Sequence, residues 1–249
     1  MTPRHAGAAD AVLFDLDGVL TSTASLHARC WKRVFDEVLA EHRRKTGQRQ
    51  APFDPHRDYL AHVDGRTRAD GVRDFLAARG IVLPEGSPDS DSSGRSVHGV
   101  GNRKQALVDR ALRVEPAEAF PGSVRWVREL RAAGVRTAVV SSSTNCRAVL
   151  RSAGIADLFE LTVDGSDVSA AGLRGKPAPD AFLEAARRLE VPPRRAAIVE
   201  DAIAGVAAGR AGRFGLVIGV ARTATPGALR AAGADVVVSD LEELCNGTG

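Results

Sequence analysis

The sequence contains few aromatic residues, few cysteines and no long apolar run, and these absences limit the core that it can form and the classes of protein to which it can belong. Phe, Trp and Tyr make up 4% of the 249 residues, so a buried core must consist mainly of Ala, Val and Leu. Cys30, Cys146 and Cys245 are far apart and form no C-x-x-C pair, which argues against a disulfide framework or a zinc site. No apolar run approaches the roughly 18 residues of a membrane-spanning helix, and the first ten residues lack a signal-peptide core.

A large excess of charge of one sign is also missing. The chain has 34 basic and 31 acidic residues, for a formal net charge of +3. A nucleic-acid-binding protein usually gathers its excess cations into a patch. The basic run 42–45 instead falls at the end of a predicted helix, where cations complement the helix dipole. We therefore expect no nucleic-acid partner, no membrane partner, and a reduced, cytoplasmic location.

What the sequence does contain is a repeated alternation of short β-branched runs and helical stretches. Hydrophobic residues make up 44% of the chain, enough for a sizeable core. Helical patterns cover, for example, 123–133 and 179–189. Strands are predicted over 11–16, 135–140, 196–199, 216–220 and 235–238. This alternation predicts an α/β fold, a parallel sheet with helices on both faces, in which ligands bind at the carboxyl ends of the strands.

The alternation is interrupted by a largely helical interval between the first two predicted strands. Helices are predicted over 25–42, 54–62, 68–79 and 102–113. We expect a core domain formed by 1–20 and 118–249 and an inserted α-helical cap domain formed by 21–117. Within the cap, the stretch 84–97 is rich in Ser, Asp, Gly and Pro, and we expect it to be a mobile loop.

Two carboxylates stand two positions apart at the end of the first predicted strand, in the run F14-D15-L16-D17-G18. Side chains at i and i+2 of a strand point to the same side, so Asp15 and Asp17 would repel each other without a cation nearby. Acids at a strand end can also cap a helix or bind a structural ion. The pair alone does not decide between these alternatives.

Three further clusters fall near the ends of predicted strands. Ser141 opens the run S141-S-S-T-N145, where a hydroxyl and free backbone N–H groups suit an anion, although an ordinary helix cap has the same pattern. Lys176 stands in G175-K-P-A-P-D180, where prolines restrict the backbone; a lone surface lysine would have no such context. Glu200 and Asp201 end another strand, and the glycines that follow them indicate close helix packing rather than a dinucleotide fingerprint, because G-x-G-x-x-G is absent.

Together these clusters predict phosphoryl-transfer chemistry. Oxygen ligands of this kind suit a hard cation such as Mg²⁺, which favours carboxylates and substrate phosphate. With Mg²⁺ and Lys176 present, Asp15 could attack phosphorus as a nucleophile and form an aspartyl-phosphate. Asp17, if protonated, could donate a proton to the departing oxygen.

The four clusters, in this order and spacing, resemble the signatures of the haloacid dehalogenase superfamily over about 230 residues. The resemblance implies a Rossmann-like core with a helical cap inserted after the first strand. It also implies that Asp15 is the nucleophile, Asp17 the general acid and base, and Ser141 and Lys176 the phosphate stabilisers. The implied magnesium ligands are Asp15, Asp17 (through its backbone carbonyl), Glu200 and Asp201. The lysine of this family is often followed by a cis proline, so Pro177 is expected to be cis.

Within the superfamily the sequence is most similar to the β-phosphoglucomutase subfamily. The stretch 14–31 resembles the first motif of the subfamily, with its downstream His and Trp. The run V63-D-G-R-T-R68 resembles the cap segment whose arginine binds the phosphate remote from the metal. The run N102-R-K104-Q resembles an Arg-Lys pair of the cap that faces the sugar. The substrate-binding residues that this resemblance implies are Thr23, His27, Trp31, Gly65, Arg66, Arg68, Lys104, Ser142, Ser143, Thr144 and Asn145. His27 and Trp31 are four residues apart on one helical face and could equally pack there.

The sequence also departs from the pattern of that subfamily. Ser22 stands where an acid is usual, with the Thr23 hydroxyl next to it. Thr144 and Asp64 stand where lysines are expected, which removes positive charge from around the second phosphate. Three functions therefore remain: interconversion of β-D-glucose 1-phosphate and glucose 6-phosphate through a glucose 1,6-bisphosphate, a magnesium-dependent phosphatase of a small sugar phosphate, and a catalytically silent binding module. The expected partner is a small phosphorylated sugar, and a monomer is the expected state.

Overall fold

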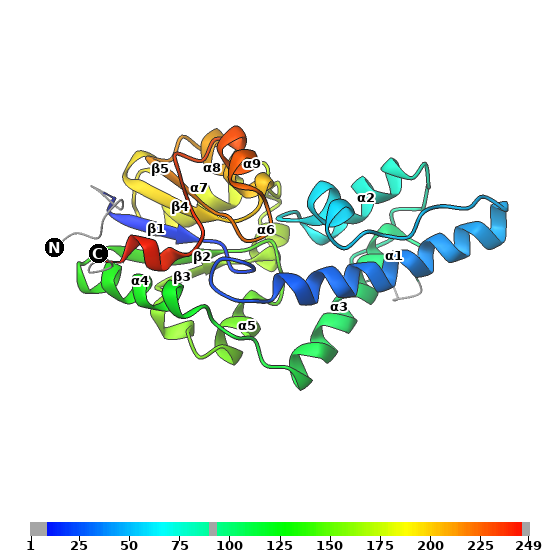
Figure 1. Cartoon of the computed structure of the whole chain (residues 1–249), viewed down its shortest axis with the longest axis horizontal. Helices are drawn as coiled ribbons and strands as arrows, with labels where there is room; N and C mark the ends of the chain where they lie inside the picture. Colours follow the sequence, from blue (N-terminus) through cyan, green and yellow to red (C-terminus); the bar gives the residue numbers. More distant parts are fainter. Residues whose placement is uncertain (1–8, 90–93, 246–249) are drawn as a thin grey trace. The chain divides into compact units, whose positions relative to one another are not determined.

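The structure, a computed structural model, describes residues 9–89 and 94–245 (Figure 1). The chain divides into two compact units, one formed by the residues up to Thr23 together with those from Pro116 onward, and the other by Ala24–Glu115. Residues 90–93 of the loop expected over 84–97 lie outside the described residues.

The first unit contains a sheet of parallel strands in the order β3-β2-β1-β4-β5-β6. The strands are β1 (Ala11–Phe14), β2 (Arg136–Val140), β3 (Leu161–Val163), β4 (Ala196–Glu200), β5 (Leu216–Val220) and β6 (Val236–Val238). The chain leaves the central strand β1 to build one side of the sheet with β2 and β3, and it later builds the other side from β4 to β6. The α/β fold predicted from the sequence is confirmed.

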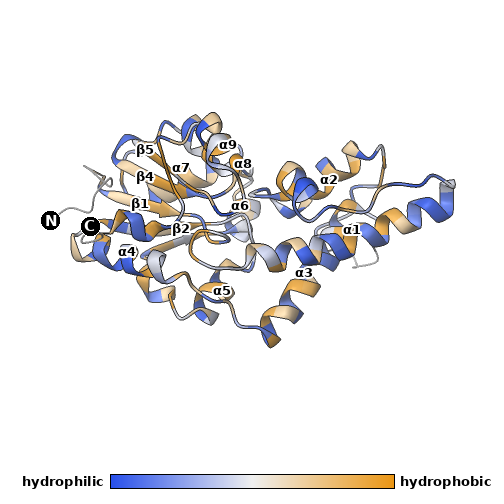
Figure 2. Ribbon diagram, in the orientation of Figure 1, coloured by the Kyte–Doolittle hydropathy of each residue, from blue (hydrophilic) through white to orange (hydrophobic). Residues whose placement is uncertain are grey.

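Helices cover both faces of this sheet, as Figure 1 shows for α4 on one side and for α7, α8 and α9 on the other. Successive side chains of β1 supply the two faces: Leu13 belongs to a buried cluster with Phe182 of α7, and the Phe14 ring lies edge-on to Trp126 of α4 with 5.6 Å between centroids. The helices of this unit are α4 (Pro121–Ala132), α5 (Cys146–Ser152), α6 (Gly165–Ala170), α7 (Asp180–Arg188), α8 (Ile203–Ala211) and α9 (Pro226–Ala232). Single 3₁₀ turns lie at Ala156–Leu158, Pro193–Arg195 and Leu241–Leu244. In Figure 2 the strands are predominantly orange, as expected for a sheet buried on both faces.

The second unit is helical and has its own core. It contains α1 (Ala24–Thr46), the π-helical turn η1 (Tyr59–Val63), α2 (Arg68–Ala78) and α3 (Val97–Val114). Scarce aromatic residues gather here: the Phe35 ring stacks on Trp31 at 4.9 Å and lies 4.1 Å from the Phe75 ring between centroids. This cluster gives the inserted segment apolar contacts independent of the sheet.

Several local predictions from the sequence are wrong. The strand predicted over 11–16 ends at Phe14, and β3 was not predicted at all. The helix expected over 54–62 is replaced at its start by a turn, in which the Asp54 side chain accepts the N–H groups of His56 and Arg57, and π-helical bonding follows at η1. Helix α3 begins at Val97, five residues before the predicted start. The described helices include none that combines the length and the apolar character needed to cross a membrane.

Candidate active site

The carboxyl ends of the neighbouring strands β1 and β4 bring three carboxylates together. The register pairs Phe14 with Val199, and the Asp15 N–H continues the ladder by donating to the Val199 carbonyl at 2.9 Å. Asp15 therefore lies beside Glu200 and Asp201, and one carboxylate oxygen of each lies within 4.8 Å of the others. All three side chains are buried. The sequence prediction that these acids meet is confirmed, while their role as metal ligands stays a prediction.

Lys176 is the cationic partner of this cluster. Its Nζ donates to Asp15 Oδ1 at 2.5 Å, to Glu200 Oε1 at 2.6 Å and to the Val140 carbonyl at 3.1 Å. All three hydrogens of the ammonium are thus used, and the side chain is buried. The peptide bond that follows Lys176 is cis, so the expectation for Pro177 is confirmed.

Burial sets the electrostatics of this pocket. Burial raises the pKa of Asp15 despite the opposing charge of Lys176, and the nearby Asp17 carboxylate raises it further. Burial likewise raises the pKa of Glu200 to about 7. Burial alone would lower the pKa of Lys176, but the Asp15 and Glu200 carboxylates reverse that effect and raise it.

The donor set fits a divalent cation. Three carboxylates against one ammonium leave a formal charge of −2 in a buried space, which is unfavourable without a further cation. Carboxylate oxygens are the ligands that hard divalent ions prefer. The backbone leaves room for the cluster: Gly18 has a φ of +86°, and a Cβ atom at this position would overlap the Asp201 carboxylate.

Asp17 lies beyond the strand, in a tight loop, so the alternation of a strand does not set its direction. Its carboxylate nevertheless repels that of Asp15, as expected from the sequence. The loop is closed by the Gly18 N–H, which donates to the Thr21 carbonyl at 2.8 Å. The Asp17 side chain accepts a hydrogen bond from the Thr23 hydroxyl, which in turn contacts the Thr21 hydroxyl at 2.9 Å. The structure therefore places Thr23, expected among the substrate-binding residues, as a partner of the Asp17 carboxylate. The Asp17 carboxylate is not one of the three that cluster, and its expected metal contact through the backbone carbonyl stays a prediction.

Ser141 follows β2 and opens a loop that hydrogen bonds to itself. Its buried Oγ accepts the Ser143 N–H at 3.1 Å, and the Ser143 Oγ accepts the Asn145 N–H at 3.2 Å. The Ser143 carbonyl accepts the N–H of Gly165, the first residue of α6, at 3.2 Å. Ser142 and Ser143 are half-buried and Thr144 is exposed. Because Val140, just before Ser141, accepts from Lys176, this loop begins next to the carboxylate cluster.

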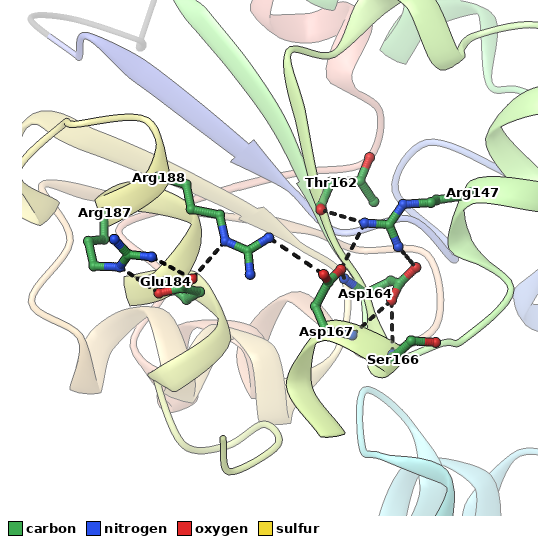
Figure 3. Close-up of polar contacts among 8 residues, drawn as sticks. All are labelled: Arg147, Thr162, Asp164, Ser166, Asp167, Glu184, Arg187 and Arg188. Atoms are coloured by element: carbon green, nitrogen blue, oxygen red, sulfur yellow. Dashed lines mark hydrogen bonds and ion pairs between the residues drawn. The ribbon is translucent and has the colours of Figure 1, made fainter. Parts of the chain in front are cut away.

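An ion-pair network secures the far end of that loop, and the sequence analysis missed it (Figure 3). Arg147, in the first turn of α5, lies between the carboxylates of Asp164 and Asp167 and also donates to the Thr162 carbonyl at 3.1 Å. Asp164 is buried and forms a capping box with Asp167 at the start of α6. Arg188 of α7 approaches the other oxygen of Asp167 at 3.5 Å. The spacing D164-G-S-D167 is the sequence signal that could have identified the cap.

In the second unit, His27, Lys104 and Trp31 form a buried group. The Lys104 Nζ lies 2.8 Å from His27 Nδ1 and 5.0 Å from the centroid of the Trp31 ring. An ammonium can only donate, so Nδ1 accepts and the imidazole carries its proton on Nε2. Burial lowers the pKa of His27 well below its usual range, and the Lys104 charge lowers it further. His27 and Trp31 thus pack within the fold, as their spacing allowed.

Arg68, the first residue of α2, is held by an amide rather than by an acid. Its Nη1 donates to Gln105 Oε1 of α3 at 3.1 Å. Arg66, which is half-buried, instead lies 3.5 Å from Asp74 Oδ2. Gly65 has a φ of +70° in the turn before α2, and Asp64 is buried. Of the two arginines in this segment, Arg68 is the one whose charge is not offset by a direct carboxylate contact.

Buried carboxylates and a lysine at the carboxyl edge of a parallel sheet are typical of enzymes that transfer phosphoryl groups through a carboxylate. Comparison with known proteins agrees with this class. The family model described as haloacid dehalogenase-like hydrolase matches residues 9–213, and the chain belongs to this family.

Three proteins named β-phosphoglucomutase are similar to this chain over most of its length. A β-phosphoglucomutase of Mycobacterium bovis is 51% identical over 237 residues, which cover 94% of this chain and 90% of the relative. A β-phosphoglucomutase of Bacillus subtilis is 31% identical over 235 residues, which cover 94% of this chain and 91% of the relative. The crystal structure of a β-phosphoglucomutase from Clostridium difficile has the same fold, with a TM-score of 0.73, 22% identity, and coverage of 95% of this chain and 93% of that one.

Proposed function

We propose that this chain interconverts β-D-glucose 1-phosphate and glucose 6-phosphate through an aspartyl-phosphate and a glucose 1,6-bisphosphate. The observation that carries the proposal is the buried contact of Lys176 with Asp15 and Glu200, found in a chain 51% identical to a β-phosphoglucomutase over 94% of its length. Phosphoryl transfer through a carboxylate, the chemistry expected of this superfamily, accounts for the buried contact and agrees with the similarity to a β-phosphoglucomutase.

Asp15 is the proposed nucleophile. Its Oδ1 accepts from Lys176, so Oδ2 is the oxygen that we assign to the attack. In the first half-reaction a bond forms between this oxygen and phosphorus, while the bond from phosphorus to the sugar oxygen breaks and its electron pair stays on that oxygen. Lys176 keeps the attacking carboxylate in one orientation and offsets part of its charge.

Asp17 is the proposed general acid and base. It donates a proton to the departing sugar oxygen and, in the second half-reaction, accepts one from the hydroxyl that attacks the aspartyl-phosphate. The Thr23 hydroxyl, which donates to the Asp17 carboxylate, holds that side chain in place. We propose that the Ser141 hydroxyl binds the phosphoryl group that is transferred, because Ser141 is the first residue of the loop and follows Val140, whose carbonyl accepts from Lys176.

Mg²⁺ is the cation that we propose for the carboxylate cluster. Asp15, Glu200, Asp201 and the Asp17 backbone carbonyl would hold it, and when bound it would offset negative charge on the phosphoryl oxygens. In this protein the ion would also offset the burial, and the repulsion between carboxylates, that raise the pKa of Asp15 and Glu200.

The second phosphate of the bisphosphate is assigned to Arg68. Guanidinium groups form bidentate bonds with phosphate, and the charge of Arg68 is not offset by a carboxylate contact. We propose that Ser143 and Asn145 add polar contacts to this phosphate, and that His27, Trp31, Gly65, Arg66, Lys104, Ser142 and Thr144 contribute to sugar binding. We further propose a monomeric, cytoplasmic enzyme with a core of 1–20 and 118–249 and a cap of 21–117.

A phosphatase of a small sugar phosphate is the second candidate. Asp64 and exposed Thr144 favour it, because both stand where the mutase pattern has a lysine. A coupled assay with glucose-6-phosphate dehydrogenase separates the two: NADPH formation from β-glucose 1-phosphate, with a trace of bisphosphate, supports the mutase. Release of inorganic phosphate without glucose 6-phosphate contradicts it and supports the phosphatase.

A further inference from the structure

Arg68 differs from the other arginines in how its charge is held. Among the described residues, the arginines that have no carboxylate within 4.0 Å are exposed, with Arg68 as the exception. Its Nη1 donates to the neutral side-chain oxygen of Gln105 at 3.1 Å. Elsewhere in the second unit a poorly exposed arginine, Arg79, is paired with the buried carboxylate of Asp58. The fold thus restrains Arg68 without neutralising it.

The orientation of Gln105 is fixed by a second hydrogen bond. Its Nε2 donates to Asp109 Oδ1 at 2.8 Å, one helical turn further along α3. An amide has one oxygen and one NH₂ group, so the contact with Asp109 turns the oxygen toward Arg68. Asp109 thus turns the amide oxygen toward Arg68, and its carboxylate also acts on the guanidinium through its charge, although it makes no direct ion pair with Arg68.

Helix α3 also leaves space for the arginine stem. Gly101 lies one turn before Gln105, and a Cβ atom at Gly101 would lie 3.0 Å from Arg68 Cγ and 3.3 Å from Cδ. Glycine in the middle of a helix is unfavourable compared with alanine, so its presence here needs a packing reason. The Arg68 side chain lying across this position supplies that reason.

We propose that Gln105 is a positioning residue, which holds the Arg68 guanidinium in one orientation and leaves its charge available to the second phosphate of the sugar bisphosphate. The proposal rests on the proposed function, since it names how one of its binding groups is prepared. A neutral partner is required for this role, because a carboxylate at the same place would take up the same guanidinium hydrogens that phosphate needs.

The test replaces Gln105 by glutamate, which has nearly the same shape but carries a negative charge that would pair with Arg68. Gln105→Glu places a carboxylate against Arg68, and Ala106→Glu, on an exposed position of the same helix, is the matched control for the added charge. We expect the KM for glucose 1,6-bisphosphate to rise about tenfold or more in Gln105→Glu and to stay within about twofold in Ala106→Glu. We also expect the Tm of Gln105→Glu to stay close to that of the wild type, because the variant gains an ion pair with Arg68 but loses the hydrogen bond to Asp109 and places two carboxylates next to each other. An unchanged KM in Gln105→Glu overturns the proposal.

A double-mutant cycle checks that Gln105 acts through Arg68. In an Arg68→Met background, Gln105→Glu is expected to cause no further rise in KM, whereas independent, additive effects would contradict the proposal. Calorimetric binding of glucose 6-phosphate to Asp15→Asn, with and without Gln105→Glu, tests the same inference without turnover. If the wild type forms no glucose 6-phosphate, the proposed mutase function fails, and the calorimetry still decides on Gln105. Equal affinities, or no binding in either variant, reject the role of Gln105.

Discussion

The Nζ atom of Lys176 lies 2.6 Å from Oε1 of Glu200, and the same nitrogen lies 2.5 Å from Oδ1 of Asp15. One ammonium therefore joins carboxylates that follow or end two neighbouring strands of the sheet. Together with Asp201 the group keeps a formal charge of −2, which a divalent cation would balance. The interplay between Lys176 and that cation gives the first prediction.

Lys176→Met is expected to abolish most of the turnover and to make the protein dependent on Mg²⁺ for stability. Removing one partner of a buried ion pair typically costs about 3–5 kcal/mol, because the remaining charges are left uncompensated. Mg²⁺ should restore part of this loss and bind the variant more tightly than the wild type, since the pocket is more negative. Urea unfolding with and without Mg²⁺ measures the effect. A loss of stability that is the same in both conditions would show that the ion does not enter this pocket.

Mg²⁺ affinity is expected to fall as the pH is lowered from about 8 to 6. Burial raises the pKa of Glu200 to about 7 and also raises that of Asp15. As the pH falls through 7, the metal-free pocket therefore takes up protons that a metal ion must displace. Calorimetry in buffers with different ionisation enthalpies should detect proton release on binding near neutral pH. Binding that is independent of pH across this range, with no proton release, argues against ligation by these carboxylates.

Arg147→Met is expected to lower kcat/KM by about tenfold to a hundredfold, through displacement of the Ser141 loop. The variant removes the bonds that join the first turn of α5 to Asp164, Asp167 and the Thr162 carbonyl (Figure 3). Arg187→Met is the matched control. Arg187 is also shown in Figure 3, but it pairs with Glu184 of its own helix. Steady-state kinetics of both variants measure the effect. Equal kinetics in the two variants would mean that the network does not support the loop.

The free energy of unfolding is expected to fall with decreasing pH below about 6.5, in part because of His27. Burial and the Lys104 charge keep its folded-state pKa well below the unfolded value, so the unfolded chain takes up a proton that the folded chain does not. Stability from this residue is therefore present above pH 6.5 and lost as the pH falls through that value. Denaturation of wild type and His27→Gln at pH 7 and 5.5 should show a pH dependence weaker by about 1 kcal/mol in the variant. Identical pH dependence would contradict a neutral, buried His27.

The sequence predicted the parts of the fold that depend on long local patterns. The runs that form β4 and β5 and the amphipathic pattern of α1 were correctly assigned, because their periodicity reflects burial on defined faces. The strand β3 was missed, since three residues at the sheet edge are specified by pairing with β2 rather than by their own sequence. The turn at Asp54 was read as a helix because side-chain bonds to the backbone compete with helix formation there.

In the candidate site, too, the features with a local sequence pattern could be predicted, and those that depend on contacts between distant residues could not. Asp15, Glu200 and Asp201 could be expected to meet, because parallel strands end at one edge of the sheet. The contacts of Lys176 with both acids, and those of Arg147 with Asp164, join residues far apart in the chain and have no local signal. Gln105 lies within the motif N102-R-K104-Q, but its role depends on its hydrogen bonds with Arg68 and Asp109, which have no signal in the sequence.

Phosphorus NMR of the purified protein with β-glucose 1-phosphate, Mg²⁺ and a trace of glucose 1,6-bisphosphate tests phosphoryl transfer through Asp15 most directly. The β-glucose 1-phosphate resonance should be replaced by that of glucose 6-phosphate with little inorganic phosphate, and Asp15→Asn should leave the spectrum unchanged. Inorganic phosphate as the sole new signal, or conversion that persists in Asp15→Asn, would contradict the account.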